Sequence, residues 1–277
     1  MRDFPVPAPL AGIVASVIAY REAIPAGSEV TERVLPDGVV RLIVELGEGR
    51  ERAPGVVPML AVGASVEPAI LRLRGKQEGL SLALRPGAAA AVLGMPAHEL
   101  SGRAVSLPDL WRGEEAGMLE RLAAIADDAA RVRLLLDILQ RRLGRHGFVV
   151  GDVGREQAMK AAQLITRASG HLGLRQVAAG IGVGERRLQQ IFRQHVGLSP
   201  REWSRLARLH GCLRDLREQT AIRWADLAVG AGFYDQPHLV NEFKALCGMT
   251  PGLFLERSGS VSSKTTAGGR SYPPRSS

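Results

Sequence analysis

A degenerate internal repeat occupies the C-terminal half of the chain, in segments 177–200 and 227–251. Matching residues are 50 positions apart before the turn of the repeat and 51 apart after it, so the second copy carries one extra residue. The matched pairs are Ala178 and Ala228, Gly182 and Gly232, Val183 and Phe233, Leu188 and Leu239, Phe192 and Phe243, Gly197 and Gly248, and Pro200 and Pro251. Because both copies keep this pattern, both are expected to form the same supersecondary unit.

Each copy predicts a short helix, a glycine-containing turn and a second helix, which together make a helix-turn-helix. The paired alanines are small enough for the two helices to cross closely, and glycine permits a turn that a side chain would strain. Leu188 and Phe192 are four residues apart and share one helix face, which should point inward together with Val183. The last glycine of each copy should end the second helix, and Ser199 and Pro200 should begin the next.

The opposite face of each second helix is polar. It carries Arg186, Gln189, Gln190 and Arg193 in the first copy and Gln236, His238, Asn241 and Lys244 in the second. Side chains of these types hydrogen-bond base edges and phosphates. Helix-turn-helix shapes also occur in bundles that bind only proteins, so a protein-interaction module is the alternative.

A helix from Pro200 to about Arg217 is expected to join the two copies, with an apolar stripe from Trp203 to Leu216. A straight helix of this length spans about 27 Å. One turn of B-DNA is about 34 Å long. The joining helix could therefore hold the two second helices in successive major grooves on one face of a duplex.

The charge of the chain is concentrated in this helical half. The whole chain carries a net charge of +8. Residues 1–154 hold 18 basic and 19 acidic residues, whereas residues 155–257 hold 15 and 9, and residues 258–277 hold three basic residues and no acidic one. Such asymmetry suggests a polyanionic partner, most often nucleic acid, and fits a merely soluble basic domain equally well.

The N-terminal half is typical of strands separated by turns. Strands are expected within 15–22, 39–46, 57–62, 69–73 and 81–85, with turns at 36–38, 47–49, Gly75 and Gly79. Short strands at this spacing predict a sandwich or a small barrel. A short helix should follow at 88–93, ended by Gly94.

Residues 114–145 carry apolar side chains in a heptad alternation from Met118 to Leu143. A dimerising coiled coil would produce this pattern. The pattern also fits a helix, or two helices broken near Asp127 and Asp128, packed on the strand domain, which the wider stripe of leucines favours.

Catalytic and metal-binding chemistry is not indicated. The two cysteines, Cys212 and Cys247, exclude a disulfide scaffold and a multi-cysteine zinc site, and leave buried thiols or a redox pair. His98 and His146 lie outside the predicted strands, so a metal-dependent cupin lacks its ligands. Asp37 is expected to be a turn residue rather than a ligand for a cation. We therefore predict no catalytic residue, no metal and no cofactor.

No apolar run reaches the roughly 18 residues that a membrane-spanning helix needs. The first residues do not resemble a signal peptide, because no apolar segment follows the first positive charge. The expected location is the cytoplasm, with no membrane partner.

The second copy reads Leu227-Ala-x-x-x-Gly-Phe-x-Asp-Gln-x-His-Leu-x-x-x-Phe-Lys-x-x-x-Gly-Met-Thr-Pro251 and resembles the signature of AraC/XylS-type transcription regulators. The resemblance covers about residues 155–257. It implies two helix-turn-helix units that read adjacent major grooves. By position, it implies base reading by Arg186, Gln189, Gln190, Gln236, His238 and Asn241, and phosphate contacts by Arg193 and Lys244. Gly184, Pro237 and Leu255 depart from the pattern of the family.

Segments 35–47 and 84–94 resemble an uncharacterised sensor-like domain that precedes such DNA-binding domains. This resemblance implies a β-rich, cupin-like domain followed by helices. The expected fold is α+β, with a sensor or dimerisation domain at 1–147, a linker at 148–154, the DNA-binding domain at 155–257 and a disordered tail at 258–277.

The predicted function is that of a sequence-specific, non-enzymatic transcription regulator with double-stranded DNA as its partner. A small-molecule effector and a homodimer are the other partners that the sequence leaves open. A cupin-type enzyme with an accessory helical domain is the remaining alternative.

Overall fold

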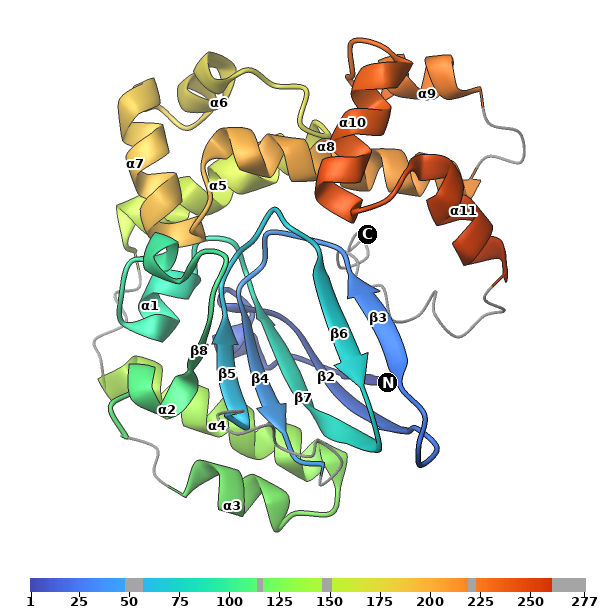
Figure 1. Ribbon diagram of the computed structural model, residues 1–277. Coiled ribbons are helices and arrows are strands. Elements are labelled where there is room, and N and C mark those ends of the chain that lie inside the picture. Colours follow the sequence, from blue (N-terminus) through green and yellow to red (C-terminus); the bar gives the residue numbers. More distant parts are fainter. Residues whose placement is uncertain (48–56, 114–116, 146–150, 219–222, 261–277) are drawn as a thin grey trace.

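The computed structural model describes residues 1–47, 57–113, 117–145, 151–218 and 223–260 (Figure 1). A β-rich N-terminal part carries helices on one side, and a wholly helical C-terminal part packs across its upper edge. The α+β architecture predicted from the sequence is thus confirmed.

Most strands of the described residues form one antiparallel sheet of six, in the order β1-β2-β7-β4-β5-β8. These strands are β1 (Arg2–Phe4), β2 (Val14–Ala23), β4 (Arg41–Glu45), β5 (Met59–Val62), β7 (Lys76–Leu84) and β8 (Ala104–Ser106). Strands β3 (Val30–Val34) and β6 (Ala69–Leu73) pair only with each other, and we call them the β3–β6 ribbon. All five predicted strand segments contain strands, whereas β1, β3 and β8 were not predicted.

The prediction of a turn at Gly79 is wrong, because this glycine lies inside β7. A Cβ at Gly79 would lie 2.2 Å from the carbonyl oxygen of Val44 and 2.5 Å from the phenol oxygen of Tyr20. The absence of a side chain at Gly79 therefore lets the Tyr20 ring and the neighbouring strand approach the β7 backbone closely. A close approach of this kind is one reason for a glycine within a strand.

Helices cover one face of the sheet. Cross-strand register places Val17, Leu82, Leu42 and Ala61 in a single row, and all four are buried in the core. The helices of this part are η1 (Ala8–Leu10), α1 (Ala89–Leu93), η2 (Ala97–Leu100), α2 (Leu107–Leu110), α3 (Met118–Ala123) and α4 (Asp128–Arg145).

The heptad pattern of residues 114–145 belongs to the core of the chain itself. Two helices, α3 and α4, share it, and Asp127 caps the second one by accepting a 2.7 Å hydrogen bond from the amide of Ala130. Met118, Leu122 and Leu136 are buried in the same core as the sheet. The two-helix interpretation is confirmed for the described residues, which begin again at 117.

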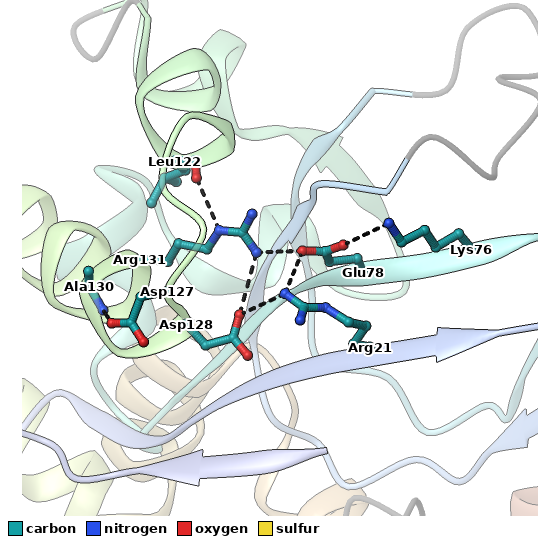
Figure 2. Close-up of polar contacts among 8 residues, drawn as sticks. All are labelled: Arg21, Lys76, Glu78, Leu122, Asp127, Asp128, Ala130 and Arg131. Atoms are coloured by element: carbon teal, nitrogen blue, oxygen red, sulfur yellow. Dashed lines mark hydrogen bonds and ion pairs between the residues drawn. The ribbon is translucent and has the colours of Figure 1, made fainter.

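A buried arginine fastens α4 to the sheet (Figure 2). The Arg131 side chain is 8% exposed and donates to the Glu78 carboxylate at 2.5 Å and to the carbonyl oxygen of Leu122 at 3.2 Å. Arg21 reaches the same carboxylate at 2.9 Å and Asp128 at 3.4 Å. The hydrogen bond from Arg131 is the largest of the effects that hold the pKa of Glu78 below its ordinary value.

The C-terminal part consists of helices alone within the described residues. They are α5 (Val153–Arg167), α6 (Leu174–Gly180), α7 (Glu185–Val196), α8 (Pro200–Glu218), α9 (Trp224–Gly230), α10 (Gln236–Cys247) and α11 (Pro251–Ser260). Helices α6 and α7 are the first helix-turn-helix unit, α9 and α10 are the second, and α8 joins them (Figure 1).

Two predicted boundaries need correction. Helix α5 begins at Val153, so residues 153 and 154 of the expected linker belong to a helix, because Asp152 caps that helix through the amide of Arg155. Helix α11 runs to Ser260, so the first three residues of the expected tail are helical. Residues 148–150 of the linker and 261–277 of the tail lie outside the described residues. None of the helices described has the length and apolar character to cross a membrane.

The two thiols are core groups. Cys212 of α8 and Cys247 at the end of α10 are fully buried. Burial raises the pKa of each thiol to about 12. Because the thiolate is the reactive form, these cysteines are inert at neutral pH, in agreement with the structural interpretation.

We expect Glu78→Gln to lower the free energy of unfolding at pH 7 by about 2 to 4 kcal/mol, because it leaves Arg131 buried without its main carboxylate partner. A carboxylate whose pKa is lower in the folded state than in the unfolded state stabilises the protein at pH values above the unfolded-state pKa. This stabilisation is lost as the pH falls through the folded-state pKa. The difference in stability between wild type and variant should therefore shrink as the pH falls below 4.5, the ordinary pKa of a glutamate side chain. Urea unfolding at pH 7 and pH 4 measures it.

Glu67→Gln, which changes an exposed glutamate of the same part, serves as the matched control for this measurement. An equal loss of stability for Glu78→Gln at both pH values would contradict the assignment.

The thiols should resist a disulfide-exchange reagent such as 5,5′-dithiobis(2-nitrobenzoic acid) in the folded protein at pH 8. Both should react promptly once urea unfolds the chain, since burial and not chemistry protects them. Labelling of the folded protein at the rate of a free thiol would show that Cys212 or Cys247 is accessible.

Candidate nucleic-acid interface

Glycines shape both helix-turn-helix units as predicted. Gly182 and Gly232 in the turns have φ of +70° and +76°. The second helices end at Gly197 and Gly248, whose φ values are +97° and +68°. These left-handed conformations favour glycine, so the backbone of each copy turns in the same two places.

The inward faces of the second helices are fully buried. Leu188 and Phe192 of α7 and Leu239 and Phe243 of α10 are at most 1% exposed. The Phe192 ring meets the ring of Trp203 edge to face, with 6.1 Å between centroids. The turn residues differ, because Phe233 is buried whereas Val183 is only half-buried, which corrects its expected inward position.

The outward faces expose the whole polar set. On α7 and α10 the following side chains are exposed: Arg186, Gln189, Gln190, Arg193, Gln236, His238, Asn241 and Lys244. The described residues of the N-terminal part do not cover any of them. The polar faces of α7 and α10 are therefore both exposed.

Some of these side chains have partners within their own unit. Arg187, which the sequence analysis did not single out, donates to the side-chain oxygen of Gln190 at 3.2 Å. This contact occupies the side-chain oxygen of Gln190. It also places the exposed guanidinium group of Arg187 beside Gln190 on the surface of α7. The three-residue spacing of Arg187 and Gln190 on a helix was the available signal.

His238 has a structural role as well as an exposed position. Its ring stacks edge to face on Phe233 at 5.5 Å, and its Nδ1 accepts a 3.2 Å hydrogen bond from the backbone amide of Tyr234. Because Nδ1 accepts this hydrogen bond, the neutral imidazole ring carries its proton on Nε2. His238 can thus offer a hydrogen-bond donor to an acceptor outside the protein.

Helices α7 and α10 begin differently. Asp235 caps α10 by accepting from the amide of His238 at 2.8 Å, whereas Gly184 leaves α7 without a side-chain cap. The extra residue of the second copy is Tyr234, which directly precedes Asp235 and is 90% exposed. Neither the cap at Asp235 nor the exposed Tyr234 was predicted from the sequence.

Helix α8 fixes the two units relative to each other. It is 19 residues long, which corresponds to about 28 Å. Ser199 and Glu202 form a reciprocal capping box at its start, with distances of 3.2 and 2.7 Å. Arg205 of α8 donates twice to the Glu242 carboxylate of α10, at 2.8 and 3.3 Å, so α10 is held directly on the joining helix.

The first unit is tied to α5 and α8. Trp203 donates through Nε1 to the Thr166 hydroxyl of α5 at 3.1 Å. His195 of α7 is buried beside the start of α5, and burial lowers the pKa of its imidazole although Asp152 opposes this effect. His195 is therefore neutral at pH 7 and is not a part of the positive surface.

Other candidate chemistry is weaker. Asp37 accepts a hydrogen bond from the amide of Val39 at 3.0 Å and pairs with Arg41, as expected of a turn residue. Among the described residues, no group of three or more His, Cys, Asp and Glu side chains lies close enough together to hold a metal ion.

Comparisons with known families match one segment in each part of the chain. A family described as "Helix-turn-helix domain" matches residues 177–257, and one described as "Domain of unknown function (DUF6597)" matches residues 2–106. The HTH-type transcriptional regulator GlxA of Rhizobium meliloti (strain 1021) is 37% identical over 79 residues. This match covers 28% of the chain and 24% of GlxA, so the chain spans about a quarter of that relative.

Two solved structures are similar in outline. ToxT from Vibrio cholerae O395 superposes with a TM-score of 0.44 at 9% identity, over 88% of this chain and 98% of ToxT. Unsaturated fatty acid bound wild-type ToxT from Vibrio cholerae strain SCE256 gives a TM-score of 0.38 at 10% identity, over 87% and 95% of the two chains.

The repeat, its two turns and the exposed polar helices all lie within the residues that the helix-turn-helix family matches. Residues 177–257 of this chain are thus similar to the helix-turn-helix domain family, and their structure contains two helix-turn-helix units.

Proposed function

We propose that this chain is a sequence-specific DNA-binding transcription regulator that places α7 and α10 in successive major grooves on one face of the duplex. The carrying observation is the pair of equivalent helices with exposed polar faces, held by one rigid joining helix. The name of GlxA, a transcriptional regulator, supports the same function for the matched segment.

The proposed mechanism is equilibrium binding without catalysis. Arg193 and Lys244 neutralise phosphates, which makes affinity fall steeply with salt. Arg186, Gln189 and Gln190 of α7 read base edges in one groove, and Gln236, His238 and Asn241 of α10 read the next. A good bidentate base contact discriminates by about 1 to 3 kcal/mol.

The N-terminal part is proposed to sense an effector or to dimerise, and so to change DNA occupancy. Such a ligand acts through its different affinity for two arrangements of the protein. Double-stranded DNA is the main partner in this proposal, and a small molecule and a second copy of the chain are the further ones. A protein that works on the chromosome belongs inside the cell.

Selection of sites from a random duplex pool, at two salt concentrations, tests the proposal. The expected result is a motif of two blocks whose centres lie about one helical turn, roughly 10 to 10.5 base pairs, apart. Salt-sensitive binding that enriches no sequence would reduce the helical part to a phosphate binder. An absence of binding at both salt concentrations would favour the protein-interaction alternative.

Two variants of α7 separate base reading from phosphate binding. Gln189→Ala should weaken binding to the selected site by about 1 to 3 kcal/mol and leave binding to random DNA nearly unchanged. Arg193→Ala should weaken binding to both DNAs to a similar extent. Fluorescence anisotropy titrations measure the four affinities, and equal losses for Gln189→Ala on both DNAs would remove it from the base readers.

A further inference from the structure

The N-terminal part holds the two reading helices at equivalent ends. The Ser101 hydroxyl donates to the carbonyl oxygen of Gly197, which ends α7, at 2.5 Å. Arg33 of β3 donates through Nη1 to the carbonyl oxygen of Cys247, the last residue of α10, at 3.3 Å. Gly197 and Gly248, which follows Cys247, are a matched pair of the internal repeat.

Both glycines are also in close contact with the N-terminal part. A Cβ at Gly197 would lie 3.1 Å from the carbonyl oxygen of Ala97 and 3.1 Å from the Ser101 hydroxyl. A Cβ at Gly248 would lie 2.2 Å from Nη1 of Arg33. The two contacts are thus tight, and each one lies on a helix end and not on a reading face.

A third contact fixes the joining helix. The carbonyl oxygen of Pro36 lies 2.9 Å from Nε2 of His210 in α8. A Cβ at Gly38 would lie 2.8 Å from the Trp203 ring and 2.9 Å from Leu206. The segment that holds these residues directly follows β3, so one stretch of chain contacts both α8 and the end of α10 (Figure 1).

The two anchors come from separate pieces of the N-terminal part. Ser101 follows η2, and the segment from α1 to η2 packs against α7. Arg33 belongs to the β3–β6 ribbon, which among the described residues does not pair with any strand of the six-stranded sheet. A shift of the ribbon against the sheet would therefore move the second unit relative to the first.

We propose that Arg33 and Ser101 are positioning residues that set the distance and rotation between α7 and α10, and through them the spacing between the two DNA blocks. This inference rests on the proposed function. Because the reading faces are exposed in the full chain, the N-terminal part acts on placement and not by covering the helices.

The first test measures spacing preference on DNA. One base pair inserted between the two selected blocks displaces the second block by about 3.4 Å and rotates it by about 35°. The preference of the wild type for the original spacing should fall about tenfold in Arg33→Ala, which loses a charge-assisted hydrogen bond, and about fivefold in Ser101→Ala, which loses a neutral one. Arg33→Lys and Ser101→Thr should restore part of it.

Matched controls lie in the same part of the chain. Arg74→Ala removes an arginine beside the ribbon whose ion pair, with Glu29 at 2.7 Å, stays within the N-terminal part. Ser65→Ala removes a hydroxyl that bonds only the local backbone at Glu67, among the contacts described. Both should keep the spacing preference of the wild type, so loss of charge or of a hydroxyl in general would not explain the result.

The second test needs no DNA. Gln194→Cys and Ala245→Cys place spin labels at exposed, equivalent positions of α7 and α10, while the buried native thiols stay unlabelled. The distance distribution from double electron–electron resonance should be narrow in the otherwise native chain. It should broaden or shift with Arg33→Ala and stay unchanged with Arg74→Ala.

The outcomes separate this inference from the proposed function. A wild type that binds no specific site would overturn the proposed function, and the label distances would still decide whether Arg33 positions α10. Variants that discriminate spacing as the wild type does, with unchanged label distances, would overturn the inference and leave DNA binding intact.

Discussion

The burial of one face of α8 is the constraint on which both helix-turn-helix units depend. Trp203, in the first turn of α8, packs against Phe192 of α7, donates a hydrogen bond to Thr166 of α5 and contacts Gly38 of the N-terminal part. Loss of a buried aromatic side chain of this kind costs about 3 to 5 kcal/mol in proteins generally. Single hydrogen bonds are worth about 1 kcal/mol. The apolar face of α8 therefore holds the units together, and the polar contacts adjust their orientation.

This separation of apolar and polar contacts explains how a stable domain keeps the polar faces of α7 and α10 exposed. Apolar residues of α7 and α10 face α8 and the neighbouring helices, and the polar residues are left on the outside. The Arg205–Glu242 pair then selects one rotation of α10 on α8, because a guanidinium and a carboxylate that bond twice have a fixed relative geometry. Ser101 and Arg33 act at the far ends of the same helices, where a small rotation moves the reading face without exposing the core.

Local and periodic features of the structure could be predicted from the sequence, and long-range features could not. The internal repeat was sufficient to predict helices α6 to α10, because glycines and apolar residues at fixed spacing determine a helix-turn-helix unit. Strand β3 was missed because its side chains are at most half-buried, which leaves little apolar alternation to detect. The cap at Asp235 was not predicted from the repeat, because the matching residue of the first copy, Gly184, makes no side-chain cap. The Arg33 contact joins residues 214 positions apart, for which a single sequence holds no signal.

The most direct measurement of the central claim is a hydroxyl-radical footprint of the full-length protein on a selected site. If α7 and α10 enter successive major grooves on one side of the duplex, two protected segments should lie on one face, with centres about 10 to 10.5 base pairs apart. A single protected segment, or two segments displaced by half a helical turn onto opposite faces, would contradict the account.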